Sequence, residues 1–114
     1  MADKTKEELF SLEQALQLLT GKKVTVHDLE HDIKVTGVVV PPNIANRSEY
    51  CVAYKRTASD GIDTTDIPKK DIHEIKTSKD GVLIVVHWSF DSAVYKYSDP
   101  RAAPLNIMLH EQGL

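Results

Sequence analysis

The stretch GKKVTVHDLEHDIKVTGVVV, residues 21–40, decides the fold because two runs of alternating apolar residues flank a polar middle. In the first run Val24 and Val26 fall on one face, which is the two-residue period of a β-strand. The second run, IKVTGVVV, alternates in the same way, and its far end is apolar on both sides, as in a strand that is covered twice. The four residues between the runs, LEHD, have the length of a hairpin loop. The sequence therefore predicts a β-hairpin with a charged, solvated turn.

The residues before this hairpin predict a helix over about residues 7–20. Four leucines recur at spacings of three, four and three, which places them on one helical face, and Ala15 and Leu18 widen that face. Gly21 suits the left-handed position at which helices end. The four leucines are Leu9, Leu12, Leu16 and Leu19.

The residues after the hairpin predict further short strands separated by turns. Pro41 and Pro42 cannot continue a central strand, so PPNIANRS is predicted to be a loop. EYCVAYKR, VLIVVHWSF and SAVYKYS are strand-like, whereas TASDGIDTT has the composition of a turn. The pattern is typical of a mostly β protein, in which an N-terminal helix precedes about five short strands that form a small barrel or a strongly bent sheet. Of these we expect the five-stranded, strongly bent barrel of the SH3-like kind. We expect one domain over residues 1–98 and a C-terminal tail or arm over residues 99–114, which ends in a short helix.

Length and composition narrow the functional classes. The chain has 114 residues, which indicates one domain, and its 14 basic and 17 acidic residues give a net charge of −3. This balance argues against a general coat for nucleic acid but leaves room for a local basic face. The single cysteine excludes an internal disulfide. No stretch approaches a membrane span and the polar start lacks a signal-peptide core, so we expect a cytoplasmic protein without a membrane partner.

Two groups of residues could carry chemistry but are interpreted as structural. His27, Glu30 and His31 resemble a metal-ligand set, yet strand periodicity places them at either end of a turn, which favours a polar hairpin end. Cys51 has apolar neighbours and no nucleophile motif around it, which indicates an inert thiol. The sequence also shows no acid–base pair, phosphate loop or zinc signature. We therefore predict no enzyme activity, no cofactor and no metal.

The scattered acids and the aromatic residues receive similar interpretations. The acids lack the ligand spacing that calcium loops need, so they are predicted to lie in solvated loops. The rings favour packing or subunit contact over base stacking. The acids are Asp60, Asp63, Asp66 and Glu74, and the rings are Tyr50, Tyr54, Trp88, Phe90, Tyr95 and Tyr97.

The segment GKKVTVHDLEHDIKVTGVV resembles the first sequence motif of the Sm-like family, especially the Hfq-type RNA chaperones. In that family a helix ends just before an alternating strand, a tight polar turn follows, and the next strand has an Ile-Lys-apolar-x-Gly pattern, here residues 33–37. The glycine, Gly37, would let the second strand bend sharply. DIPKKDIHEI could supply the second motif, with Ile72 and Ile75 as its apolar positions. The resemblance covers residues 21–39 in motif and about residues 8–90 in the order of elements.

The resemblance implies a fold, a partner and a site. It implies a non-enzymatic binding protein that assembles into a homo-oligomeric ring and contacts RNA. In this alignment the loop PPNIANRS contributes Asn43, Asn46 and Arg47 as readers of a base, and Lys69 and Lys70 as basic residues near the pore. The alternative is a protein-interaction or structural barrel, accessory or phage-borne, with no nucleic-acid role, and the acidic balance of the chain favours it. Such a barrel would bind a protein partner, with residues 99–114 as the arm.

Overall fold

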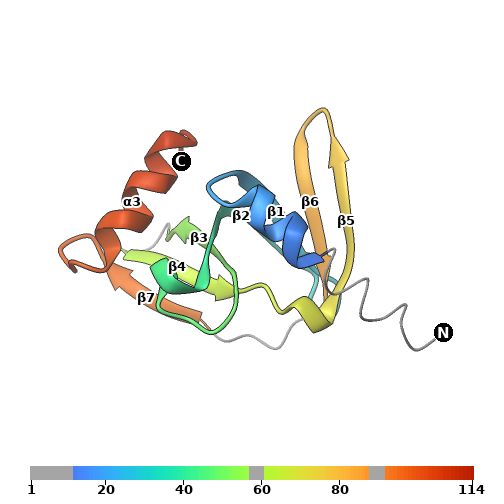
Figure 1. The fold of residues 1–114 in the computed structure, drawn as a ribbon, viewed down its shortest axis with the longest axis horizontal. Helices are drawn as coiled ribbons and strands as arrows, with labels where there is room; N and C mark the ends of the chain where they lie inside the picture. Colours follow the sequence, from blue (N-terminus) through green and yellow to red (C-terminus); the bar gives the residue numbers. More distant parts are fainter. Residues whose placement is uncertain (1–11, 57–60, 88–91) are drawn as a thin grey trace.

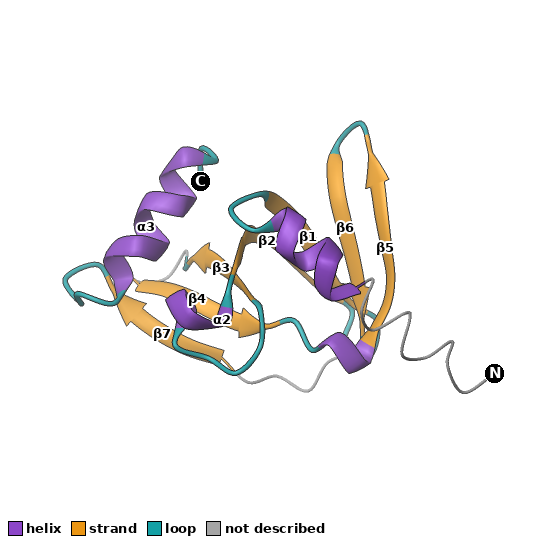
Figure 2. Cartoon of the chain, viewed as in Figure 1, coloured by secondary structure: helices purple, strands orange, loops and turns teal. Residues whose placement is uncertain are grey.

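The computed structural model describes residues 12–56, 61–87 and 92–114 of the chain, and these residues form a mostly β structure with one open sheet (Figures 1 and 2). Seven strands lie in the order β5-β6-β1-β2-β3-β4-β7. The strands are β1 (Lys23–Asp28), β2 (Ile33–Val40), β3 (Cys51–Lys55), β4 (Gly61–Asp66), β5 (Ile72–Ser78), β6 (Gly81–Val86) and β7 (Ser92–Lys96). The helical elements are residues 12–19, α2 (Pro42–Ala45), the 3₁₀ turn η1 (Lys69–Asp71) and α3 (Ala102–Glu111).

The prediction of a five-stranded barrel was wrong. The described sheet has seven strands and is open, with β5 and β7 at its two edges. Part of the error lies in the predicted turn TASDGIDTT. Its residues 61–65 belong to β4, which lies between β3 and β7. Its side chains are almost all buried, so tertiary pairing outweighs the turn-like composition. PPNIANRS was also wrong as a plain loop, because its first half forms the short helix α2.

The predicted hairpin is confirmed, with β1 and β2 paired antiparallel from Lys23↔Val38 to Asp28↔Ile33. On its other side β1 pairs in parallel with β6, beginning at Val24↔Val82. Every other neighbouring pair in the sheet is antiparallel. Strand β1 therefore joins a segment from far along the chain to the N-terminal hairpin.

Gly37 lies next to the point at which the pairing of β2 with β1 ends and its pairing with β3 begins. The β2–β3 pairing covers only the end of β2, starting at Val38↔Ala53. A Cβ atom on Gly37 would fall against the carbonyl oxygen of Ala53 and 2.8 Å from Cγ2 of Val52, so the backbone of β3 passes too close for any side chain. Figure 1 shows the result, in which β5 and β6 run steeply across the direction of β4 and β7. The structure thus explains why a glycine stands at position 37, whereas the sharp bend of β2 stays a prediction and the sheet is open.

Two apolar clusters cover opposite faces of this sheet. The first cluster contains Leu16 of the N-terminal helix, which is fully buried against side chains of β1, β2, β3 and β6. The second cluster forms beneath α3. Leu18 is 79% exposed, so the prediction that it widens the helix face was wrong. The first cluster comprises Leu16, Val24, Val26, Val35, Val39, Val52, Ile67, Ile84 and Val86, and the second Val38, Val40, Ala45, Cys51, Ala53, Ile62, Tyr95, Ala102, Leu105 and Leu109.

The alternation of β2 explains how one strand serves both clusters. Val35 and Val39 belong to the first cluster, while Val38 and Val40 belong to the second. Successive side chains of a strand point to opposite faces, so the apolar run at the end of β2 is buried on both sides, as its sequence predicted. Residues 99–114, the predicted C-terminal tail or arm, include α3. Leu105 and Leu109 of α3 complete the second cluster.

In the described parts of the chain no helix has the length and apolar character needed to cross a membrane.

Candidate functional site

The five residues implied by the resemblance lie around α2 and η1. Asn43 is exposed on α2, and Asn46 ends that helix with a left-handed φ of 55° and an exposed side chain. Arg47 follows directly, and it forms two parallel hydrogen bonds with Asp66 of β4, Nε to Oδ1 and Nη2 to Oδ2, both 3.0 Å long. This bidentate ion pair is largely buried and fixes the loop after α2 to the sheet.

The two lysines lie on η1 and have different surroundings. The Lys69 ammonium lies 3.4 Å from Oε1 of Glu13 in the N-terminal helix, and its backbone N–H donates to Oε2 of Glu49 at 3.4 Å. Lys70 is exposed. The structure thus brings the loop after α2 next to η1, but it commits Arg47 and Lys69 to carboxylates of the same chain. Their contact with RNA stays a prediction.

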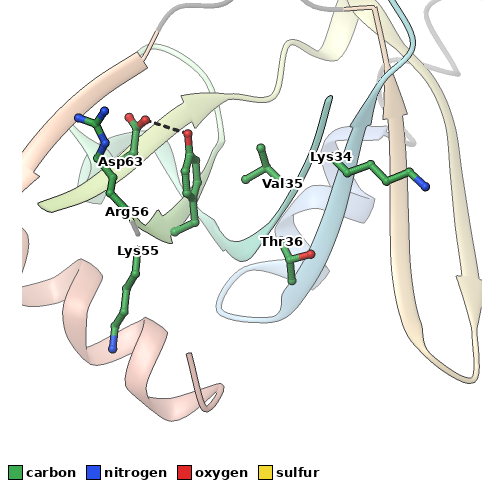
Figure 3. Close-up of a pocket in the computed structure, with 7 residues that line it drawn as sticks. Lys34, Val35, Thr36, Lys55, Arg56 and Asp63 are labelled. Atoms are coloured by element: carbon green, nitrogen blue, oxygen red, sulfur yellow. Dashed lines mark hydrogen bonds between the residues drawn. The ribbon is translucent and has the colours of Figure 1, made fainter. Parts of the chain in front are cut away.

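A groove of about 390 Å³ opens beside residues 34–36, which precede Gly37 in β2, where β2 and β3 diverge (Figure 3). Its walls come from β2 and from the end of β3 with the neighbouring part of β4. The volume is within the range of ~300–1,000 Å³ that is typical of small-molecule sites. The lining residues are Lys34, Val35, Thr36, Tyr54, Lys55, Arg56 and Asp63.

The polar centre of this groove is the pair formed by Tyr54 and Asp63. These residues are direct neighbours across β3 and β4, and the Tyr54 hydroxyl donates to Oδ2 of Asp63 at 2.8 Å. Burial, together with this bond to a carboxylate, raises the pKa of Tyr54, so the hydroxyl remains a donor at neutral pH. Asp63 is only 7% exposed, and its Oδ1 is buried with no hydrogen-bond partner among the described residues.

Thr65, two residues after Asp63 in β4, has a second buried side-chain oxygen. This oxygen, Oγ1, meets no partner in full hydrogen-bond geometry among the described residues, although its contact with the Tyr54 hydroxyl lowers the pKa of Tyr54. Residues 63 and 65 lie on the same face of β4 because side chains alternate along a strand. A buried polar atom without a partner costs free energy and is uncommon in folded proteins. The groove lining therefore includes one buried acceptor, Oδ1 of Asp63, that the described chain leaves unused.

Three basic residues also line the groove, and two of them, Lys34 and Lys55, extend away from Asp63 (Figure 3). Lys34 comes from β2, Lys55 from the end of β3 and Arg56 from the residue after it. Figure 3 shows Lys34 and Lys55 extending from different strands and away from each other. None of the three forms an ion pair with another described residue. The groove lining thus carries three positive side chains and one acid on a chain whose net charge is −3.

The histidines of the β1–β2 hairpin have structural partners. Nε2 of His27 lies 3.0 Å from Oδ1 of Asp32, and Nδ1 of His31 lies 2.6 Å from Oδ2 of the buried Asp28. Asp28 also accepts the backbone N–H of Glu30, as in a tight polar turn. Within the described ranges there is no group of three or more histidine, cysteine or acidic side chains that could hold a metal ion.

Cys51 lies in the second cluster and is fully buried. Burial, followed by the hydrogen bond from its Sγ to Oδ1 of Asp66 at 3.3 Å, raises the pKa of the thiol far above its ordinary value. A thiol of this kind is a poor nucleophile.

The sequence did not indicate that Asp63 lines a groove, because Asp63 lies in a segment with the composition of a turn. The β-branched residues around it, Ile62, Thr64 and Thr65, were the available signal for a strand. The interpretation of Asp63 as a solvated acid was wrong, and so was that of the largely buried Asp66. Trp88, Phe90 and Asp60 lie outside the described residues.

Comparisons of the chain with protein-family models, with curated proteins and with solved structures found no match.

Proposed function

We propose that this protein is a non-enzymatic binding module of Sm-like character that contacts single-stranded RNA through the groove between β2 and β3. The observation that carries the proposal is the set of three basic residues, Lys34, Lys55 and Arg56, that line this groove. Basic side chains without partners are the usual means by which proteins attract a phosphate backbone. The close approach of β3 to Gly37 and the β1–β2 hairpin support the Sm-like part of the proposal.

The arrangement of the charges favours an extended anion over a compact one. A single phosphate is bound best when cations converge on it, whereas Lys34 and Lys55 point away from each other (Figure 3). Cations on separate walls suit a ligand that carries negative charges along its length. A single-stranded nucleic acid is such a ligand, because it places phosphates at regular intervals on both sides of an unpaired base.

The experiment compares two double variants with equal loss of charge. Lys34→Gln with Lys55→Gln removes two groove cations, and Lys69→Gln with Lys70→Gln removes two cations from η1. Binding of a fluorescein-labelled single-stranded RNA is followed by anisotropy at several salt concentrations. Each phosphate contact contributes about 0.7 to the slope of log affinity against log salt for single strands. The groove variant should therefore have a slope shallower by about 1.4 and a lower affinity.

The η1 variant distinguishes the two candidate sites. If the groove is the site, this variant should bind RNA as the unmodified protein does. If it alone lowers the affinity and the slope, RNA binds at η1 and the groove proposal is wrong. Equal behaviour of both variants and the unmodified protein would contradict RNA binding at either set of lysines.

We propose a second function, self-assembly through the edges of the sheet, because a specific feature favours it. Among the described strands, β5 and β7 each pair on one side only, and most side chains of β5 are exposed. The pairings along the sheet make β5 and β7 run in opposite directions. When one copy continues the sheet of the next, β7 therefore meets β5 in the antiparallel sense, and repetition of this contact generates a ring if the rotation closes.

Solution mass by light scattering tests the self-assembly. A mass that is a whole multiple of the chain mass, constant over a range of concentrations, is the expected result. A monomer at all concentrations would contradict it. If an oligomer forms without any RNA affinity, the chain is instead a structural or protein-interaction module, which is the alternative that its acidic balance favours.

A further inference from the structure

The unused hydrogen-bonding capacity of the groove points to a particular part of its ligand. Oδ1 of Asp63 accepts no hydrogen bond from a described residue, while the Tyr54 hydroxyl holds Oδ2 in place at 2.8 Å. A carboxylate whose other oxygen is fixed in this way can rotate little. It therefore presents one acceptor in a defined direction, and this acceptor requires a donor.

The surroundings of Asp63 limit which donor can fill this role. Three basic side chains border the same groove, so a free cation would be repelled on approach. The donor must belong to a ligand whose remaining charge is negative. An unpaired nucleobase meets both conditions, because its edge carries N–H groups and its own backbone carries phosphate.

We infer that Asp63 reads the base in this groove by accepting hydrogen bonds from the Watson–Crick edge of guanine; this inference rests on the proposed RNA-binding function. Guanine presents two adjacent donors, the N1–H and the exocyclic amino group. One donates to the unpartnered Oδ1, and the other donates to Oδ2, which has a second lone pair besides the one that accepts from Tyr54. Uracil presents one N–H between two carbonyl oxygens, and these oxygens face a carboxylate unfavourably. The groove therefore selects guanine over uracil.

Access to Asp63 requires a small rearrangement of the groove. Oδ1 is buried in the free protein, so a groove side chain must move before a base reaches it. Arg56 is exposed and forms no ion pair with a described residue, and it is therefore free to turn aside. In its new position the guanidinium remains next to the groove and can stack on the base or contact its phosphate.

The test uses three labelled hexanucleotides that differ at one base: UUUGUU, UUUIUU with inosine, and UUUUUU. Inosine keeps the N1–H of guanine but lacks the exocyclic amino group. We expect the intact protein to bind UUUGUU about tenfold more tightly than UUUUUU, the scale of one good bidentate contact. UUUIUU should bind with an affinity between these two. This comparison needs no variant and so does not depend on whether a substituted chain folds.

Asp63→Asn supplies the second arm, with Asp80→Asn as its charge-matched control on the exposed β5–β6 turn. An asparagine can still accept the Tyr54 hydroxyl, but its amide nitrogen donates where guanine also donates. Asp63→Asn should lose the preference for guanine over uracil, whereas Asp80→Asn should keep the preference.

Each remaining outcome has a defined meaning. Equal affinity of the intact protein for the three hexanucleotides, with a salt slope that depends on Lys34 and Lys55, would overturn the base reading and leave the proposed function standing. Binding of none of them would overturn both. A guanine preference that survives in Asp63→Asn would assign the selection to another residue and so refute the inference.

Discussion

Replacement of Gly37 by alanine tests the close approach of β3 to β2. In an ordinary strand this substitution would stabilise the protein by about 0.4–1 kcal/mol, because alanine has less conformational freedom in the unfolded chain. Here the added Cβ would meet the backbone oxygen of Ala53 and Cγ2 of Val52. A backbone oxygen in a paired strand cannot move aside as the end of a flexible side chain can. We therefore expect Gly37→Ala to lower the free energy of unfolding by roughly 3 kcal/mol, the upper part of the range for overpacked cores.

The assay is urea denaturation followed by far-UV circular dichroism. Gly113→Ala is the control, because Gly113 has a left-handed φ of 76° and nothing within 4 Å of an added Cβ. That variant should lose about 1 kcal/mol through backbone strain alone. A loss of 3 kcal/mol would be a large part of the ~5–15 kcal/mol that stabilises a typical domain. If Gly37→Ala were as stable as the unmodified protein, or more stable, the close approach would not exist.

Three further predictions concern the titratable groups. Burial opposes the ionisation of Asp28, but hydrogen bonds with His31 and with the backbone of Glu30 outweigh burial and hold the pKa of Asp28 below its ordinary value of 3.8. Its contribution to stability is thus complete above about pH 4 and is lost as the pH falls through the lowered pKa, so Asp28→Asn should show a weaker loss of stability in acid urea titrations. Tyr54 should ionise above its ordinary pKa of 10 in an absorbance titration at alkaline pH, and Asp63→Asn should lower that value. Cys51 should react with a thiol reagent only as fast as the protein opens, and a fast reaction in native buffer would contradict its burial.

The parts of the fold that could be predicted from the sequence depend on local periodicity. The β1–β2 hairpin was predicted because its apolar residues alternate over both strands and its turn is short and polar. The N-terminal helix, described over residues 12–19, was predicted from the spacing of its leucines, and α3 from Leu105, Met108 and Leu109 on one side. These signals need only neighbouring residues, and the burial of Leu16, Leu105 and Leu109 agrees with them, whereas the exposed Leu18 does not.

The parts that could not be predicted depend on pairing between distant segments. GIDTTD is a strand because β3 and β7 lie on either side of it, and no local pattern encodes those partners. The groove depends on the same pairing, since Tyr54 and Asp63 meet only through the register of β3 with β4. Asn43, Asn46, Arg47, Lys69 and Lys70 were selected by alignment to a motif, which carries no information about the carboxylates that occupy Arg47 and Lys69.

The parallel pairing of β1 with β6 has a consequence for how the chain matures on the ribosome. β1 and β2 leave the exit tunnel together and can pair at once, but the second neighbour of β1 comes from residues 81–86. Until that segment emerges, one side of β1 has unpaired N–H and C=O groups next to exposed valines. An exposed strand edge of this kind can pair with a strand of another chain. We expect the nascent protein to be most prone to misassociation during this interval, and fragments that end before β6 to aggregate.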